Sequence, residues 1–300
     1  MKLVVKFNLV FAAIFALGLV VAGFTSNALL QANARDEVVQ NARIMMESAL
    51  ATRSYTTRHI APLLRDQLAV EFLPESVPAF AATEKFAAMR ERFPDFSYKE
   101  ATLNPTNLRD RATDWEADVI ERFRNDAGLE EMIGERDAAS GRSLYLARPI
   151  RVKDPACLMC HSTPDAAPAT MIRRYGAANG FGWQLDEAVG AQIVSVPTAV
   201  PQAKAAAALE SFIVSLAAVF AFLVLALNLM LHFVVIRPIG KMARLADEVS
   251  LGRLDAGEFE ATRKKDEIGT LARSLGRMKK SVKRALEMLE SDDERKEDPS

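Results

Sequence analysis

Two long apolar stretches dominate the pattern of hydrophobic and polar residues along this 300-residue chain. The first, Phe7–Phe24, has no charged residue and follows two lysines; the second, Ser211–Ile236, is also uncharged and is followed by an arginine. Uncharged stretches of this length are typical of transmembrane helices, whose positively charged flanks face the cytoplasm. The pattern predicts two membrane spans, with residues 1–6 in the cytoplasm and residues 25–210 in the periplasm.

A cleaved signal peptide is an alternative interpretation of the first stretch. Ala32–Ala34 reads Ala-Asn-Ala and resembles the small-residue site at which signal peptides are cut. The site lies well beyond the end of the apolar stretch, which is longer than a usual signal core. Cleavage would remove the first anchor and leave the location of residues 25–210 unchanged.

Helical periodicity returns after the second span. Pro238 suits a first helical turn, where its missing N–H would have no partner. Apolar residues then recur in two stripes with the alternating three-and-four spacing of a coiled-coil seam. The stripes are Ile239, Met242, Ala246 and Val249, then Ile268, Leu271, Leu275, Met278 and Val282. A connector with Gly252, Leu254 and Gly257 separates them.

Two short amphipathic helices directly after a membrane span resemble a HAMP domain, the parallel four-helix signal relay of bacterial receptors. Asp266–Gly269, which reads Asp-Glu-Ile-Gly, is the most specific part of the resemblance. It implies a coiled-coil HAMP helix pair over residues 237–290, in the cytoplasm beneath a bacterial inner membrane. One chain cannot bury both stripes, so we expect a homodimer. The alternative is an amphipathic helix lying on the lipid surface.

The last residues, 291–300, are strongly charged and predict a disordered tail. We expect no kinase, cyclase or methyl-accepting module after them. We therefore expect the signal to pass to a separate cytoplasmic protein of the kinase or chemotaxis type.

The periplasmic segment predicts an α+β fold. A long helix over residues 27–69 continues from the first span and is bent or broken near Pro62. Further helices are predicted at Ser76–Phe93 and Asp114–Asn125. Strands are predicted at 95–103, 142–152 and 189–197, and Asp137–Arg142 suits a hairpin turn. Together they give a modest antiparallel sheet with flanking helices, placed between the two spans.

Charge gives no sign of a polyelectrolyte partner. The formal net charge is −1, so the chain as a whole does not indicate a nucleic-acid-binding protein. Paired carboxylates such as Glu130 and Glu131 lie in charged surface stretches without a candidate pocket. We therefore expect no enzymatic activity.

Residues 157–161 read Cys-Leu-Met-Cys-His and hold both cysteines of the chain. A disulfide would close too small a loop to stabilise the fold, a zinc site would need more ligands, and a thioredoxin-like dithiol requires a βαβ unit. Cys-x-x-Cys-His is the attachment signature of c-type haem. We predict one covalently attached haem c, anchored by Cys157 and Cys160, with the Nε2 atom of His161 as the proximal iron ligand.

The sixth iron position is the least determined part of this site. Met45 and Met46 on the long helix, and His59 further along, are the available donors. A methionine pair on an amphipathic helix also suits a hydrophobic core, and a histidine beside an arginine suits solvent. We favour Met45 or Met46 as a tentative distal ligand over His59.

Other side chains near the motif suit haem contacts. Arg148 and Arg151 precede the loop, and a guanidinium matches the geometry of a haem propionate. Exposure at the surface of a strand would explain both equally well. Tyr145, Phe181 and Trp183 could line the porphyrin, although aromatic residues in an α+β core need no such role.

The periplasmic sequence also resembles a known family. "ATLNPTNLRDRATDWEADVIERF", "GRSLYLARPI", "ACLMCHSTP" and "YGAANGFGWQLDEAVGAQIVSVP" look like the bacterial haem-c sensor domains formerly catalogued as a domain of unknown function. The resemblance covers roughly residues 36–200. It implies a PAS-like core that often precedes HAMP, with a haem iron that reports redox state or a diatomic gas.

Two functions of different classes follow from these patterns. The first is a membrane receptor whose haem signal passes through the HAMP helices. The second is a membrane-anchored c-type cytochrome that carries electrons, and a weaker third is a periplasmic thiol oxidoreductase. A paired-helix relay after the anchor favours the receptor, because an electron carrier does not need one.

Overall fold

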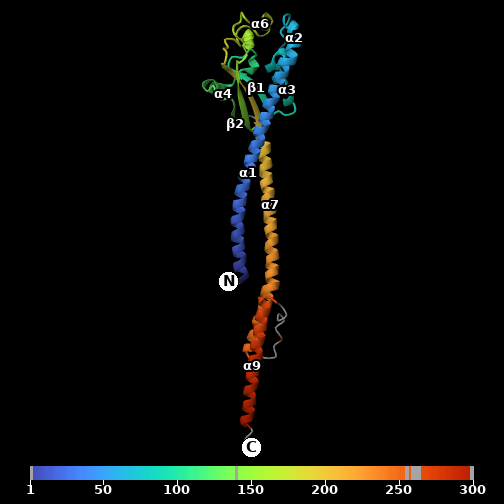
Figure 1. Ribbon diagram of the computed structural model, residues 1–300, viewed down its shortest axis with the longest axis vertical. Helices are drawn as coiled ribbons and strands as arrows, with labels where there is room; N and C mark the ends of the chain where they lie inside the picture. Colours follow the sequence, from blue (N-terminus) through green and yellow to red (C-terminus); the bar gives the residue numbers. More distant parts are fainter. Residues whose placement is uncertain (1–2, 139–140, 254–256, 258–264, 298–300) are drawn as a thin grey trace. The chain divides into compact units, whose positions relative to one another are not determined.

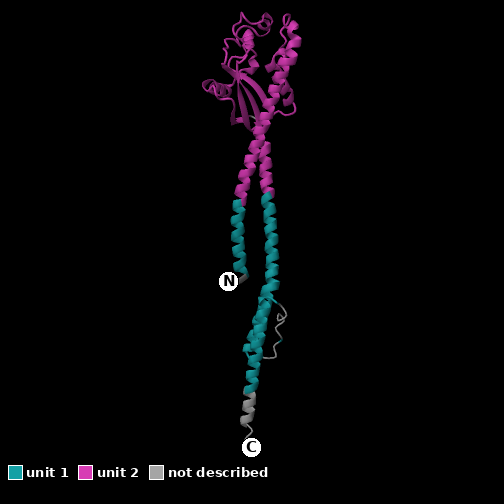
Figure 2. Cartoon of the chain, viewed as in Figure 1, with its two compact units in different colours: residues 1–21, 212–300 teal, residues 22–211 magenta. Residues whose placement is uncertain are grey.

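The computed structural model describes residues 3–138, 141–253, 257 and 265–297. The chain divides into two compact units, which are coloured separately in Figure 2. One, here called the sensor unit, is Ala22–Ser211. The other, the anchor unit, combines Met1–Val21 with Phe212–Ser300. Each unit is described by itself.

A four-stranded antiparallel sheet forms the centre of the sensor unit (Figure 1). The strand order is β1-β4-β3-β2, so the long strands β3 and β4 lie in the middle. The strands are β1 (Ser97–Thr102), β2 (Met132–Ala138), β3 (Gly141–Arg151) and β4 (Ala188–Pro197). The predicted α+β class with an antiparallel sheet is confirmed, and the PAS-like description stays a prediction.

The edge strand β2 was not predicted. Its sequence, Met-Ile-Gly-Glu-Arg-Asp-Ala, has few β-favouring residues. The segment is a strand because it pairs with β3, and not because of its own composition. Gly134 is required here, because a Cβ at this position would lie 2.5 Å from the hydroxyl oxygen of Tyr145 on β3. The central residues of the predicted turn at Asp137–Arg142 lie outside the described residues.

One face of the sheet is covered by α1 (Leu3–Tyr55) and α3 (Pro78–Arg90). Small and flexible side chains of α1 recur at helical spacing and pack on β1, β3 and β4. The buried set is Val38, Ala42, Met45, Met46 and Ala49 of α1, Ala82 and Phe86 of α3, and Tyr98, Leu144, Leu146, Val194 and Val196 of the strands.

The opposite face is covered by α4 (Asp114–Asn125), seen on the far side of the sheet from α3 in Figure 1. The helix has the predicted bounds, and a capping box between Thr113 and Glu116 starts it. Val119, Ile120 and Phe123 pack on alanines of three strands, whose small side chains let the helix approach closely. The two faces follow from the alternation of side chains along each strand.

The long helix that begins the sensor unit is interrupted where the sequence predicts a bend. α1 passes into a π-helical turn at Thr56–Ile60 and then into α2 (Ala61–Leu68). Pro62 has no N–H for the usual bond to the carbonyl four residues earlier, so the regular ladder cannot run through this point. Short 3-10 turns follow at Pro74–Ser76 and Leu108–Asp110.

Helices make up the described part of the anchor unit after the second apolar stretch. α7 (Ala199–Met230) leads through a π-helical segment, Leu231–Ile236, into α8 (Arg237–Ser250), and α9 spans Glu267–Glu297. Asp266 caps α9, because its Oδ1 atom accepts from the backbone N–H of Gly269 at 2.8 Å. The sequence predicts a disordered tail over residues 291–300, whereas α9 continues to Glu297. Glutamate, lysine and arginine, which are frequent there, favour helix.

The two helices α8 and α9 bury only part of the predicted stripes against each other. Met242 and Ala272 are buried, and Leu245, Ile268 and Leu275 pack around them. Other apolar side chains of the same helices are exposed in one chain: Ile239, Leu271, Met278 and Val282. Of the predicted connector, Gly252 has a φ of +80°, and Leu254 lies outside the described residues.

Two helical stretches, Val4–Leu68 and Ala199–Ser250, each contain a segment long and apolar enough to cross a membrane. Within the anchor unit, the rings of Phe15 and Phe220 stack with centroids 3.5 Å apart. The side-chain amides of Asn8 and Asn228 bond reciprocally, each Nδ2 donating to the other Oδ1 at 2.9 and 2.8 Å. This pair of amides links the two apolar segments through polar hydrogen bonds.

We expect Asn8→Leu and Asn228→Leu to lower the free energy of unfolding in bicelles by about 1 kcal/mol each. Each single change leaves one amide without its partner in hydrocarbon, whereas the double change removes both amides. The double variant should therefore lose clearly less than the sum of the two. Val10→Leu, at an exposed apolar position, is the control. Strictly additive losses would contradict the pairing.

Candidate functional site

The Cys-x-x-Cys-His segment lies in the long connection between the central strands β3 and β4. A 3-10 turn, Pro155–Cys157, leads into the single helical turn α5 (Leu158–His161), and α6 (Ala169–Tyr175) follows. The Oδ1 atom of Asp154 accepts from the N–H of Ala156 at 2.9 Å and starts the turn. Three residues apart on this helical segment, Cys157 and Cys160 share one face.

Both cysteines are free thiols and half-buried. Burial and the nearby Asp154 carboxylate raise the pKa of Cys157, while burial and Cys157 raise the pKa of Cys160. The two side chains are therefore protonated at neutral pH. Protonated thiols are poor nucleophiles for disulfide exchange.

His161 has one ring nitrogen engaged and the other available. Its Nδ1 atom lies 2.8 Å from the carbonyl oxygen of Gly180, which can only accept, so Nδ1 carries the proton and donates. Trp183 stacks on the imidazole with centroids 3.9 Å apart and planes 10° from parallel. Burial lowers the pKa of His161, outweighing the carbonyl bond. The result is a neutral, oriented imidazole with Nε2 as its lone-pair donor.

A glycine-rich strap, here defined as residues 176–187, holds this imidazole. The N–H groups of Gly182 and Trp183 donate to the carbonyls of Ser162 and His161 at 2.9 and 3.2 Å. Gly180 has a φ of +85°, and a Cβ there would lie 2.0 Å from the Oγ1 atom of Thr106. That Oγ1 atom is buried and lacks a hydrogen-bond partner among the described residues. Only glycine therefore fits at position 180.

These residues fit the predicted haem c. Two neutral thiols on one helical face can form the thioether links, and His161 presents the ligand tautomer that second-shell bonding normally fixes. The chemistry of this donor set also distinguishes it from a thioredoxin-like dithiol, whose attacking thiol has a lowered pKa.

Met45 and Met46 lie in the core between α1 and the sheet, and Met46 is fully buried. The predicted role of either methionine as the sixth iron ligand stays a prediction. His59 lies in the π-helical turn, exposed, with its ring 5.2 Å from that of Tyr55.

The two arginines predicted as propionate partners point elsewhere. Arg148 pairs with Glu47 at 2.7 Å and with Glu131 at 3.0 Å. The Nη2 atom of Arg151 donates to the carbonyls of Phe123 and Asp126 at the end of α4. Both arginines precede the cysteine loop in sequence, but this position did not determine where their side chains point, because side chains on a strand project to its two faces.

Of the three aromatic residues, the structure brings one to the imidazole. Trp183 stacks on His161, whereas Tyr145 packs against Trp115 on the α4 face of the sheet. Phe181 lies in the strap, and its carbonyl accepts from Asn104 at 3.4 Å.

Sequence reasoning missed a charged residue of α1. Arg53 lies on the inward face of the helix, and its Nη1 atom pairs with the Glu100 carboxylate on β1. The signal was present as an arginine at helical spacing from Met46 and Ala49 on an otherwise apolar stripe.

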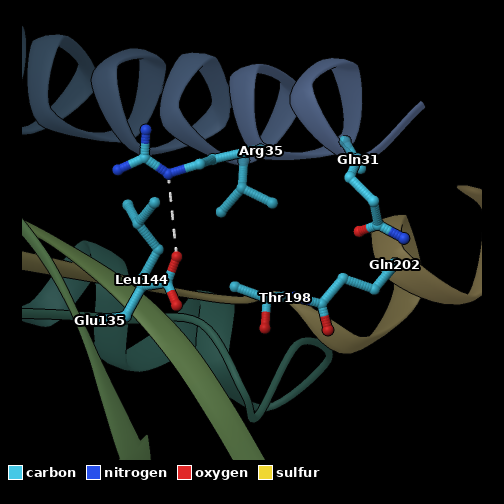
Figure 3. A pocket seen from close by; sticks show the side chains of 8 residues that line it. Gln31, Arg35, Glu135, Leu144, Thr198 and Gln202 are labelled. Atoms are coloured by element: carbon cyan, nitrogen blue, oxygen red, sulfur yellow. Dashed lines mark ion pairs between the residues drawn. The ribbon is translucent and has the colours of Figure 1, made fainter. Parts of the chain in front are cut away.

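A cavity of about 200 Å³ lies at the other end of the sheet from the cysteines (Figure 3). The lining residues of the sheet lie near the start of β3 and the end of β4, whereas the cysteine segment follows the end of β3. Arg35 of α1 and Glu135 of β2 face each other across it, 3.8 Å apart. Half of the remaining lining is polar, from Gln31, Thr198 and Gln202, and half is apolar.

Comparison with known proteins bears on the identity of both parts of the chain. The model of the Tll0287-like family matches residues 31–197, which is more than half of the chain. The chain belongs to the Tll0287-like family. The HAMP domain model matches residues 223–284, which confirms the predicted relay after the second apolar helix. The two apolar helices and this HAMP domain fit a two-pass membrane protein.

One solved structure is also similar to the Tll0287-like part. It is the crystal structure of the cyanobacterial heme-protein Tll0287, with 15% sequence identity and a TM-score of 0.41. The match covers 54% of this chain and 95% of that one. No curated protein matches the sequence.

We expect Gly180→Ala to lower the free energy of unfolding of the haem-free chain by roughly 2–4 kcal/mol, through strain at positive φ and the collision with Thr106. Gly176→Ala is the matched control, because its φ is +80° and its Cβ would meet open space. That variant should lose only about 1–2 kcal/mol. Urea titration followed by tryptophan fluorescence measures both, and equal losses would contradict a special role for position 180.

Proposed function

We propose that this protein is a membrane receptor whose periplasmic sensor unit carries one covalent haem c and passes its state through a cytoplasmic HAMP dimer to a separate signalling protein. The observation that carries the proposal is the His161 imidazole, which is neutral and oriented with Nε2 available. It directly follows Cys160 on the short helix α5, and Cys157 ends the 3-10 turn just before that helix; both thiols are free.

The residues have separate tasks in this proposal. Cys157 and Cys160 form the thioether links, and His161 supplies the axial nitrogen. The Gly180 carbonyl keeps the proton on Nδ1, and Trp183 holds the ring plane. Bound there, the haem would supply an iron centre that changes oxidation state or takes a diatomic ligand.

The HAMP domain favours a receptor over an electron carrier. α8 and α9 bury part of their apolar stripes within one chain and leave Ile239, Leu271, Met278 and Val282 exposed. A second copy of the chain would cover these residues in a four-helix bundle with two packing arrangements. The proposal therefore includes a homodimer and a downstream partner of the kinase or chemotaxis type.

Covalent haem attachment is tested by producing the full chain in a bacterium with a functional cytochrome c maturation system. After denaturation, the wild-type polypeptide should keep its Soret absorbance, and the Cys157→Ser/Cys160→Ser variant should lose it. Met159→Ala, at an exposed position between the two cysteines, should keep it. A wild-type chain of apoprotein mass would contradict the proposal. Carbon monoxide binding by the ferrous protein then separates gas sensing from redox sensing.

The dimeric relay is tested with Leu271→Asp. A charge in the seam should weaken dimerisation in mild detergent by about 100-fold, or roughly 3 kcal/mol, while the haem spectrum stays unchanged. Ser274→Asp, at an exposed polar position of α9, should leave the dimer intact. Sedimentation measures the dimer fraction. A wild-type protein that is monomeric at every concentration would contradict the relay.

A further inference from the structure

Four ion pairs fasten α1 to the sheet and the residues just before β2, and one differs from the others in its burial. Three of them, Arg35–Glu135, Arg43–Glu131 and Glu47–Arg148, each have one side chain more than half exposed. In the fourth, the side chain of Arg53 is 27% exposed and that of Glu100 is 6% exposed. Exposed pairs contribute little, so the buried pair is the one with a strong local field.

The carboxylate of Glu100 is also bound through its other oxygen, the one that Arg53 does not contact. The Tyr98 hydroxyl donates to the Oε1 atom of Glu100 at 2.7 Å, and the Nε2 atom of Gln192 donates to the Tyr98 oxygen at 3.2 Å. Burial and the Glu100 carboxylate raise the pKa of Tyr98, so its hydroxyl stays a donor. Glu100 is therefore fixed in place, and it fixes the guanidinium in turn.

Arg53 is bound at the end of the sheet from which the cysteine segment leaves, because its partner Glu100 pairs across β4 with Arg148, three residues before the end of β3. Its positive charge opposes the rise in the pKa of Cys157 that burial and Asp154 cause. Burial acts to lower the pKa of Arg53, and the Glu100 carboxylate outweighs it, so the arginine is charged. Arg148 and Arg151, the two arginines nearer in sequence, are bound to other groups.

Stability alone gives this pair little reason to exist. Desolvation of two buried charges roughly cancels their attraction, and apolar residues of similar volume would often serve as well. An apolar side chain at position 53 would continue the stripe formed by Met46 and Ala49. The pair is better explained by its effect on a charge close by.

We propose that Arg53, held in position by Glu100, is the positioning residue that sets the charge balance of the haem site and couples that site to α1. This inference rests on the proposed attachment of haem at Cys157 and Cys160. A cation near the site favours the state with one positive charge fewer, and the carboxylate partner offsets part of that effect. Because Arg53 is carried by α1, a change of charge at the site changes the force on that helix.

The test is a spectroelectrochemical titration of the full-length protein loaded with haem, in detergent, with electrons supplied by an electrode through mediators. Arg53→Gln should lower the ferrous-to-ferric ratio at a fixed potential about tenfold, a shift of about 59 mV for one electron. Glu100→Gln should move the ratio in the opposite direction. Arg43→Gln, which removes an exposed pair from the same helix, should leave it unchanged.

Opposite signs separate an electrostatic role from a structural one, because loosening of the fold would move both variants the same way. Arg53→Lys keeps the charge and should stay near the wild type, which covers the case in which Arg53→Gln folds poorly. Haem-loaded variants with unchanged potentials, or with shifts of the same sign, would overturn this inference alone. A wild-type chain without covalent haem would overturn the proposed function and this inference with it.

Discussion

The packing of α1 across one face of the sheet is the constraint on which the rest of the sensor unit depends. Val38, Ala42 and Met46 of this helix are almost completely buried against β3 and β4. Because this face of α1 packs on the sheet, Arg53, which is seven residues after Met46 on the same face, lies beside Glu100. A rise of about 1.5 Å per residue separates the two positions by roughly 10 Å along the helix. The core and the charged pair are therefore parts of one face.

The sheet in turn determines where the cysteine segment lies. β3 and β4 are its two central strands, and the connection between them carries the thiols, the imidazole and the strap. Antiparallel neighbours return the chain to the same end of the sheet, so residues nineteen apart in sequence, His161 and Gly180, come into hydrogen-bond contact. The cavity near Arg35 and Glu135 belongs to the other end, where α7 follows β4.

Much of this architecture could be predicted from the sequence, because local signals and tertiary packing agree. Alternation predicted β1, β3 and β4, and the spacing of apolar residues predicted α4 and the helices of the HAMP domain. β2 was missed because its order comes from pairing with β3 rather than from its own residues. The charged end of α9 was misjudged because composition cannot distinguish a solvated helix from a disordered tail.

The site was predictable in its chemistry and less so in its surroundings. Cys157, Cys160 and His161 lie within five residues of sequence, so a short motif identifies them. Arg148 and Arg151 were chosen for their closeness in sequence, yet the direction of a strand side chain depends on the register with β4 and on the helices packed over it. Arg53 and Glu100 are 47 residues apart, and only the packing of α1 brings them together.

The bond from His161 to the Gly180 carbonyl has a consequence for how iron is bound. The ring torsions are fixed when the polypeptide folds, because a backbone acceptor and the Trp183 indole restrain them before any metal is present. Immobilising a free side chain on binding costs about 0.5–1.5 kcal/mol, and here that entropy is lost in advance. In the proposed haem site, a preorganised ligand of this kind would meet the iron as a rigid donor, and less of the binding free energy would be spent on ordering the side chain.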